Sequence, residues 1–318
     1  MNKQIYQHSF RQKALAALLF CVLFWGFSFI SIKITVEVFP PMSLGMLRFA
    51  IALGFLFLLK LKLAPHEKLN VKDIPMLFFA GLFGVFFYFF FQNIGITLVS
   101  ASESSIAIGS IPILAMIADW LEGKITSKKN TEIPASEIGV RQWLGAFISI
   151  AGVWLVAGVS LAISGSILGY MYMSGAALSW VTYSLITRKL FARCSRIYIV
   201  FWQSAAGLIC FIPFSLREIS GWGIPDITVI AHLLFLGICC SALGFFFYAQ
   251  ALKNLGISVC AIFINMIPVV TVIFGFFILG ERLSPLQWLG AALVISGVYL
   301  AMQSREKSKL KSKPEDKG

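Results

Sequence analysis

The sequence predicts an all-α polytopic membrane protein with ten transmembrane helices, built as two inverted five-helix repeats. Three observations indicate this: an apolar composition, an internal repeat and a one-sided distribution of Lys and Arg. Hydrophobic residues make up 58% of the 318 residues and charged residues only 13%, whereas a soluble domain carries about 25% charged residues. A continuous apolar run of about 20 residues spans a bilayer as a helix, because lipid offers no partner to an unpaired backbone.

Ten apolar stretches are long enough to be spans, and several are joined by only a few residues, so neighbouring helices are expected to run antiparallel. The predicted spans cover about 14–34, 42–61, 74–97, 101–121, 140–159, 167–187, 197–216, 228–250, 255–279 and 286–303. A polar insert at about 122–137 separates the fourth span from the fifth. The final residues, 304–318, predict a disordered basic cytoplasmic tail.

The internal repeat is visible as a short motif that occurs twice. The letters QWLGA stand at Gln142–Ala146 and again at Gln287–Ala291, each time at the start of an apolar stretch. Alignment on two helix-interior prolines then assigns five spans to each half, 1–160 and 161–303. An odd number of spans turns the second half upside-down relative to the first, and such inverted repeats are typical of secondary transporters.

Lys and Arg gather in the segments that this topology places on one side of the membrane. The positive-inside rule therefore predicts that the N- and C-termini are cytoplasmic, and we expect an integral protein of a bacterial inner membrane. The net charge of +12 is accounted for by these loops and by attraction to anionic lipid headgroups. We therefore expect membrane lipids as partners, and no nucleic acid.

The sequence shows no feature of catalysis, metal binding or cofactor binding. The six cysteines form no spaced ligand pair and are expected to be reduced thiols within the core. No G-x-x-x-x-G-K-[ST] loop is present to hold a nucleotide phosphate. A membrane-embedded enzyme, such as a lipid-group transferase, is the alternative reading. It would need acid, base or metal-binding groups clustered at one depth, so we expect no enzymatic activity.

A set of motifs occurs in a fixed order along the chain, some in the first half and some in the second. Through them the chain resembles the EamA family of the drug/metabolite transporter superfamily. The matching residues are Trp25–Phe29, Pro41, Arg48-Phe49, Ala251-Leu252, Pro268, Leu279–Leu283, Gln287–Gly290 and Gly297. The resemblance covers about residues 14–303 and implies transport of small metabolites or amino acids, commonly efflux. The first half departs from the pattern, because the polar insert replaces its Gly-Glu turn.

Three ionisable residues are candidates for coupling or gating, because charged groups at membrane depth are costly and usually face a cavity or a partner. Arg48, inside the second span, is an anion-binding or gate residue, or else a cation that reaches back to the interface. Glu103 stands at the start of the fourth span, where a helix N-terminus favours negative charge; it is a proton carrier or simply a helix-start residue. Asp119 lies near the cytoplasmic end of the same span.

Neutral polar and aromatic residues within the spans are the candidates for solute binding. They are Trp25, Tyr88, Gln92, Asn93, Trp180, Tyr183, Trp202, Tyr248, Gln250 and Asn265. Aromatic faces suit an aromatic or cationic solute, although lipid contact is the alternative for each ring. Pro112 and Pro268 are expected to break their helices and to free backbone carbonyls for a solute.

Small residues at seven-residue spacing form smooth faces on the fifth and tenth spans. Gly145 and Gly152 mark one face, and Gly290 and Gly297 the other. Such faces let helices approach closely, either within one chain or between two chains of a homodimer.

The leading functional hypothesis is a secondary transporter that exports or exchanges a small organic solute, an amino acid or a related metabolite, by alternating access. Proton coupling, exchange and facilitated diffusion remain open.

Overall fold

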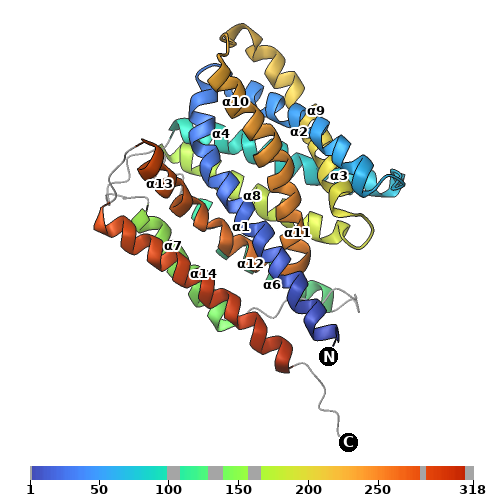
Figure 1. Cartoon of the computed structure of the whole chain (residues 1–318), viewed down its shortest axis with the longest axis vertical. Helices are drawn as coiled ribbons and strands as arrows, with labels where there is room; N and C mark the ends of the chain where they lie inside the picture. Colours follow the sequence, from blue (N-terminus) through green and yellow to red (C-terminus); the bar gives the residue numbers. More distant parts are fainter. Residues whose placement is uncertain (1, 99–107, 128–138, 157–165, 280–283, 312–318) are drawn as a thin grey trace, which may run out of the picture.

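The computed structural model describes residues 2–98, 108–127, 139–156, 166–279 and 284–311 (Figure 1). Every regular element within these segments is helical, which confirms the all-α prediction. Seven helices in the described part of the chain are long and apolar enough to cross a membrane, where the sequence predicts ten. Of the other three predicted spans, 101–121 and 140–159 include residues outside the described segments. The third, 167–187, carries many hydroxyl side chains.

The first half of the chain contains two long helices, a composite helix and two shorter helices. The long helices are α1 (Asn2–Val36) and α2 (Pro41–Leu63). After a 3-10 turn, η1 (Val71–Asp73), the composite helix consists of α3 (Ile74–Gly81), the π-helical segment η2 (Leu82–Phe87) and α4 (Tyr88–Leu98). The shorter helices are α6 (Ile111–Ser127) and α7 (Val140–Val156).

The second half follows the same order of elements. It begins with α8 (Ile167–Leu190) and α9 (Arg196–Glu218), which ends in the 3-10 turn η3 (Ile219–Gly221). The next composite helix consists of α10 (Ile227–Phe235), the π-helical segment η4 (Leu236–Gly244) and α11 (Phe245–Leu255). The last helices are α12 (Ile257–Ile264), α13 (Met266–Leu279) and α14 (Pro285–Lys311). Helix α14 thus continues beyond the predicted span, into the segment for which a disordered tail is expected, and residues 312–318 lie outside the described part.

The helix ends follow from local sequence. Ser195 caps α9 by accepting a hydrogen bond from the backbone N–H of Tyr198 at 3.3 Å, and Asp226 caps α10 by accepting one from Val229 at 2.8 Å. Gly256 has φ 80° between α11 and α12. That left-handed conformation favours glycine, and it lets the chain turn sharply from one helix into the next.

Both composite helices cross a neighbour at a glycine, which lies just before the π segment η2 in the first case and within the π segment η4 in the second. A Cβ on Gly81 would collide with the backbone carbonyl of Gln203 in α9. A Cβ on Gly237 would lie 2.5 Å from the side chain of Ile51 and 3.1 Å from the carbonyl of Arg48, both in α2. The two composite helices are therefore held close to α9 and α2, and π segments of this kind occur frequently at functional sites.

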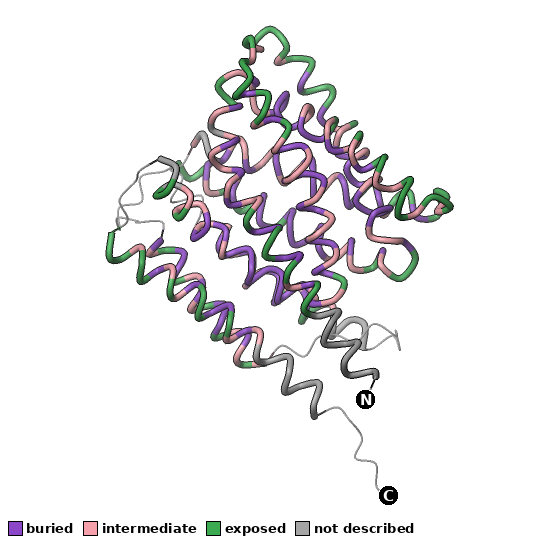
Figure 2. Tube along the Cα trace, in the orientation of Figure 1, coloured by how far each residue is buried: buried purple, intermediate pink, exposed green. Residues whose placement is uncertain are grey.

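Buried residues line the inner faces of the central helices, where α2 packs against α9, α1 against α11 and α4 against α8 (Figure 2). Large apolar side chains cover much of the outside: Leu58 is 66% exposed, Phe277 76% and Tyr299 63%. An apolar exterior on this scale suits contact with lipid and would be a liability in water.

The glycine faces of α7 and α14 meet each other within one chain, and the two helices lie side by side at the lower left of Figure 1. A Cβ on Gly145 would lie 2.5 Å from the carbonyl of Gly297, and one on Gly152 would lie 2.6 Å from that of Gly290. The missing side chains therefore allow backbone-to-backbone contact. Within one chain the two glycine faces cover each other. The homodimer stays a prediction.

We expect Gly152→Ala to lower the melting temperature of the detergent-solubilised protein, because the added methyl group meets the backbone of α14. Overpacking of this kind costs about 1–3 kcal/mol. Gly54→Ala is the matched control, since no atom lies within 4 Å of a Cβ at Gly54 in α2. Equal melting temperatures for the two variants would contradict the close α7–α14 contact.

Candidate functional site

Five of the predicted aromatic residues form one cluster in the middle of the molecule. This aromatic cluster consists of Trp25 (α1), Tyr88 (α4), Trp180 and Tyr183 (α8) and Tyr248 (α11). Trp180 is at its centre, with ring centroids 5.2 Å from Trp25, 5.0 Å from Tyr88, 5.2 Å from Tyr183 and 5.0 Å from Tyr248. The structure thus brings together residues that are far apart in the sequence and come from four helices.

Hydrogen bonds fix the rings of the cluster. The indole N–H of Trp25 donates to the carbonyl of Cys240 in the π segment η4 at 3.1 Å. The hydroxyl of Tyr248 lies 3.1 Å from that of Ser184, and the hydroxyl of Tyr183 accepts from Gln203 Nε2 at 3.2 Å. The buried indole N–H of Trp180 meets the geometric criteria for a hydrogen bond with none of the described residues.

Arg48 lies beside the aromatic cluster and is 4% exposed. Its Nε donates to the hydroxyl of Ser241 in η4 at 2.8 Å, and its Cζ lies 4.5 Å from the ring centroid of Phe89. No salt bridge to Arg48 exists within the described part of the chain. A buried guanidinium without a carboxylate is unusual, since isolated buried charges are strongly disfavoured.

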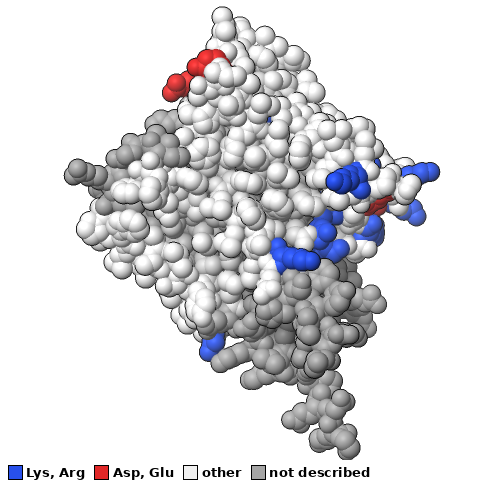
Figure 3. Space-filling view, viewed as in Figure 1, with Lys and Arg blue, Asp and Glu red and all other residues white. Residues whose placement is uncertain are grey.

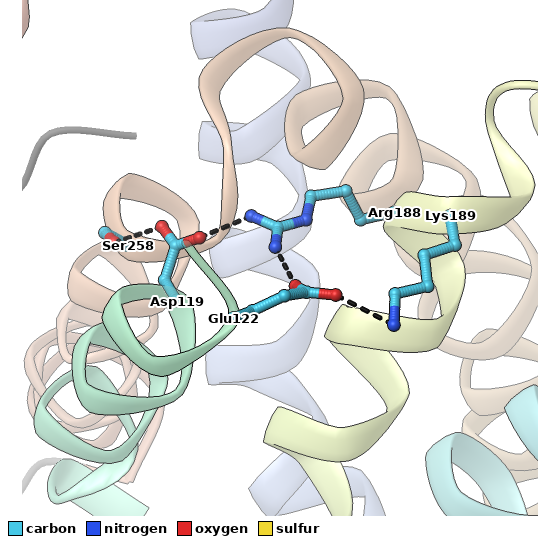
Figure 4. A network of polar contacts seen from close by, with 5 residues as sticks. All are labelled: Asp119, Glu122, Arg188, Lys189 and Ser258. Carbon is cyan, nitrogen blue, oxygen red and sulfur yellow. Dashed lines mark hydrogen bonds and ion pairs between the residues drawn. The ribbon is translucent and has the colours of Figure 1, made fainter. Parts of the chain in front are cut away.

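An ion-pair network joins the interior of α6 to the end of α8 and the start of α12, and Figure 4 shows its five residues. Arg188 of α8 bridges Asp119 and Glu122, both of α6. Lys189 Nζ lies 2.8 Å from Glu122 Oε1, and Ser258 of α12 donates to Asp119 Oδ2 at 3.1 Å. Asp119 is fully buried, and Arg188 and Ser258 contact one carboxylate oxygen each.

Sequence reasoning found Asp119 but missed its partners. In the sequence Arg188 is one of the many Lys and Arg residues between predicted spans, and no pattern distinguishes Ser258. The available clue was that two adjacent basic residues end one apolar helix while acidic residues end another, a pattern that suits pairing between the two ends.

Helices α2 and α9 run antiparallel, and a carboxylate at or just beyond the end of each helix accepts hydrogen bonds at the start of the other. Glu218, at the end of α9, accepts hydrogen bonds from the backbone N–H and the hydroxyl of Ser43 in the first turn of α2, at 2.8 and 3.0 Å. Glu67, which follows α2, accepts from the backbone N–H of Ser195 at the start of α9 at 2.8 Å. Each helix N-terminus thus receives a negative charge, and the central helix pair is fixed at both ends.

The other polar candidates lie outside the aromatic cluster or take part in helix contacts. Asn93 donates to the carbonyl of Pro41 at 3.2 Å, and the carbonyl of Gln250 accepts from Asn254 at 2.7 Å. Trp202 packs against Tyr198 and Phe201 of its own helix. Gln92 is buried.

Two helices are interrupted just before the predicted breaking prolines. The α-helical pattern stops at Ser110, before Pro112, and at Asn265, before Pro268. Asn265 Nδ2 donates to Ser149 of α7 at 2.8 Å, while its Oδ1 is buried and has no partner among the described residues. Glu103 lies outside the described residues. Within those residues, no group of three or more His, Cys, Asp or Glu could hold a metal ion.

Comparison with known proteins identifies the relatives of this chain. A model of the EamA-like transporter family matches residues 12–131 and 167–303. An uncharacterized transporter from Archaeoglobus fulgidus is 29% identical over 289 residues, which cover 89% of this chain and 96% of the relative. A probable terminal-alkyne amino-acid exporter from Streptantibioticus cattleyicolor is 26% identical, with 91% and 93% covered. A solved crystal structure with 18% identity has the same fold, with a TM-score of 0.75 over 93% of this chain and 98% of its own.

We expect Arg188→Gln to destabilise the protein strongly, because it removes the guanidinium that pairs with the buried carboxylate of Asp119. Removal of one partner of a buried pair costs about 3–5 kcal/mol, and Asp119→Asn in the same chain should recover part of that loss. Lys189→Gln is the control, since Lys189 is half exposed and such pairs contribute about 0–1 kcal/mol. Thermal unfolding of the three variants measures the difference. An Arg188→Gln variant as stable as the control would disprove the network.

Proposed function

Because the chain belongs to the EamA-like transporter family, we propose that it is a secondary transporter that exports or exchanges a small organic solute by alternating access. The observation that carries this proposal is the aromatic cluster, which lies beside the buried Arg48 where helices from both halves of the chain meet. An amino acid or a related metabolite is the proposed solute class. A relative named as a probable amino-acid exporter supports this class.

The arrangement we propose is ten membrane-spanning helices in two inverted repeats. Matching features in the two halves support it. Each half has a composite helix with a π segment, η2 or η4, and a later helix that is interrupted before a proline. Equivalent helices also pack on each other, as α2 does on α9 and α7 on α14. In such a design, exchange of two packings between the halves opens a central site to alternate sides.

We propose further that both termini are cytoplasmic and that the membrane is the bacterial inner membrane. Helix α1 begins and α14 ends toward the same, lower end of the molecule in Figure 1. Lys and Arg atoms gather on the right-hand and lower parts of the face in Figure 3, where one patch of Asp or Glu lies among them, whereas the upper tip shows Asp or Glu atoms without Lys or Arg. This distribution supports a cytoplasmic lower end.

The ion-pair network is the proposed cytoplasmic gate. It ties α6 of the first half to α8 and α12 of the second half (Figure 4). Movement of one half against the other would separate these helix ends, so the pairs must break before the cytoplasmic side opens. A network of this kind holds one of two alternative packings until a solute shifts the balance.

Flux through purified protein in liposomes tests the proposed function. Radiolabelled amino acids and related metabolites are offered with and without a pH gradient, and we expect flux that saturates and is abolished in empty liposomes. The absence of flux for every solute would contradict the proposal. A flux that follows the pH gradient would assign proton coupling, and an unchanged flux would assign exchange or facilitated diffusion.

We expect Trp180→Ala to lower the flux of the transported solute at a subsaturating concentration by about tenfold, since loss of one aromatic face weakens solute contact by roughly 1.4 kcal/mol. Trp288→Ala is the matched control, because Trp288 is 56% exposed on the outer face of α14. Initial rates at equal protein density decide the comparison. Equal loss in both variants would argue against the aromatic cluster as the solute site.

A further inference from the structure

The surroundings of Arg48 indicate which charged group the transported solute carries. This inference rests on the proposed function. We infer that the Arg48 guanidinium anchors a carboxylate of the solute, so that the protein carries monocarboxylates with an apolar or aromatic body. The carboxylate is the charged group that the site recognises, and an amino group on the solute is dispensable.

The first argument is that the guanidinium lacks a counter-ion. Arg48 is 4% exposed, and it forms no salt bridge within the described chain. Its interacting titratable neighbours are the Tyr88 hydroxyl and the Cys240 thiol, and neither is a carboxylate. A cation at membrane depth usually pairs with an anion or lines a pathway, so the solute is the natural source of the negative charge.

The second argument is the geometry of the remaining donors. Nε is used by the hydroxyl of Ser241 at 2.8 Å, while Nη1 and Nη2 donate to no described residue. The free edge of the guanidinium therefore presents two parallel N–H groups. This edge matches the two oxygens of a carboxylate.

The third argument is the surface that continues from the guanidinium. The ring of Phe89 lies against Arg48, with 4.5 Å between its centroid and Cζ. The ring centroid of Tyr88 lies 5.0 Å from that of Phe89 and 5.0 Å from that of Trp180. A solute whose carboxylate binds Arg48 can therefore extend an apolar or aromatic body along these rings.

The fourth argument concerns the amino group. The buried or half-buried acidic side chains of the described chain are engaged elsewhere. Asp119 and Glu122 bind Arg188, Glu218 and Glu67 accept hydrogen bonds at the starts of α2 and α9, and Asp73 pairs with Arg193. None of them lies in the aromatic cluster. An ammonium group would meet aromatic rings and neutral oxygens there, but no carboxylate of a described residue, and such neutral groups attract a cation more weakly than a carboxylate does.

The alternative is that Arg48 is a structural residue, a cation that reaches the membrane interface. The geometry argues against this, because the side chain is turned inward onto Ser241 and Phe89 and stays buried. A structural arginine would also be expected to pair with an acceptor that leaves no donor free.

Three probes that differ only in charged groups test the inference on the full-length protein in detergent: phenylalanine, 3-phenylpropanoate and phenylalaninamide. Thermal shift reports binding, because a ligand of the folded state raises its melting temperature. We expect 3-phenylpropanoate to bind at least as tightly as phenylalanine, and the amide to bind at least tenfold more weakly. Arg48→Gln should remove the difference between acid and amide, whereas Arg217→Gln, an exposed arginine at the end of α9, should preserve it.

Arg48→Lys keeps the charge without the two-pronged edge. We expect it to retain the preference for the acid at a lower affinity, which a purely structural role would not produce. If Arg48→Gln does not fold, the order of the three probes on the native protein and on Arg48→Lys still decides the matter. Equal binding of 3-phenylpropanoate and phenylalaninamide, or no binding of any of the three probes, would overturn the inferred class of solute. Binding without flux in liposomes would instead contradict the proposed transport and leave the anchor in place.

Discussion

The structure depends on one constraint: a guanidinium is held inside an apolar helical bundle without a carboxylate partner among the described residues. Arg48 is kept there by a hydroxyl of η4 and by the face of Phe89. Both contacts require that α2, α4 and η4 lie close together. The glycine at Gly237 allows that approach, because any side chain there would meet α2. The charge, the π segment and the glycine therefore form one arrangement, and replacement of any of them disturbs the other two.

The aromatic cluster follows from the same arrangement. The π segment that places Ser241 on Arg48 also directs the carbonyl of Cys240 to the indole of Trp25. In this way one irregular stretch of backbone orients a cation and an aromatic donor side by side. The ion-pair network ties α6 of the first half to α8 and α12 of the second half.

Much of this was accessible from the sequence. Apolar composition determined the all-helical membrane class, and the motifs along both halves indicated the family that the comparisons confirm. The residues Trp25, Trp180 and Tyr248 were identified individually because large polar-tipped rings stand out in apolar runs. Their mutual contact could not be predicted, since no local spacing encodes which faces of distant helices meet. Arg188, Ser241 and Ser258 were missed for the same reason. A basic residue at a helix end and a serine inside a span acquire a role only through partners that lie far away in the chain.

The most direct test of this account is an experimental structure of the protein with 3-phenylpropanoate bound. We expect density for the carboxylate within hydrogen-bond distance of Arg48 Nη1 and Nη2, with the phenyl ring against the aromatic cluster. Density for the ligand at another place, together with an Arg48 side chain paired to a carboxylate of the protein, would contradict it.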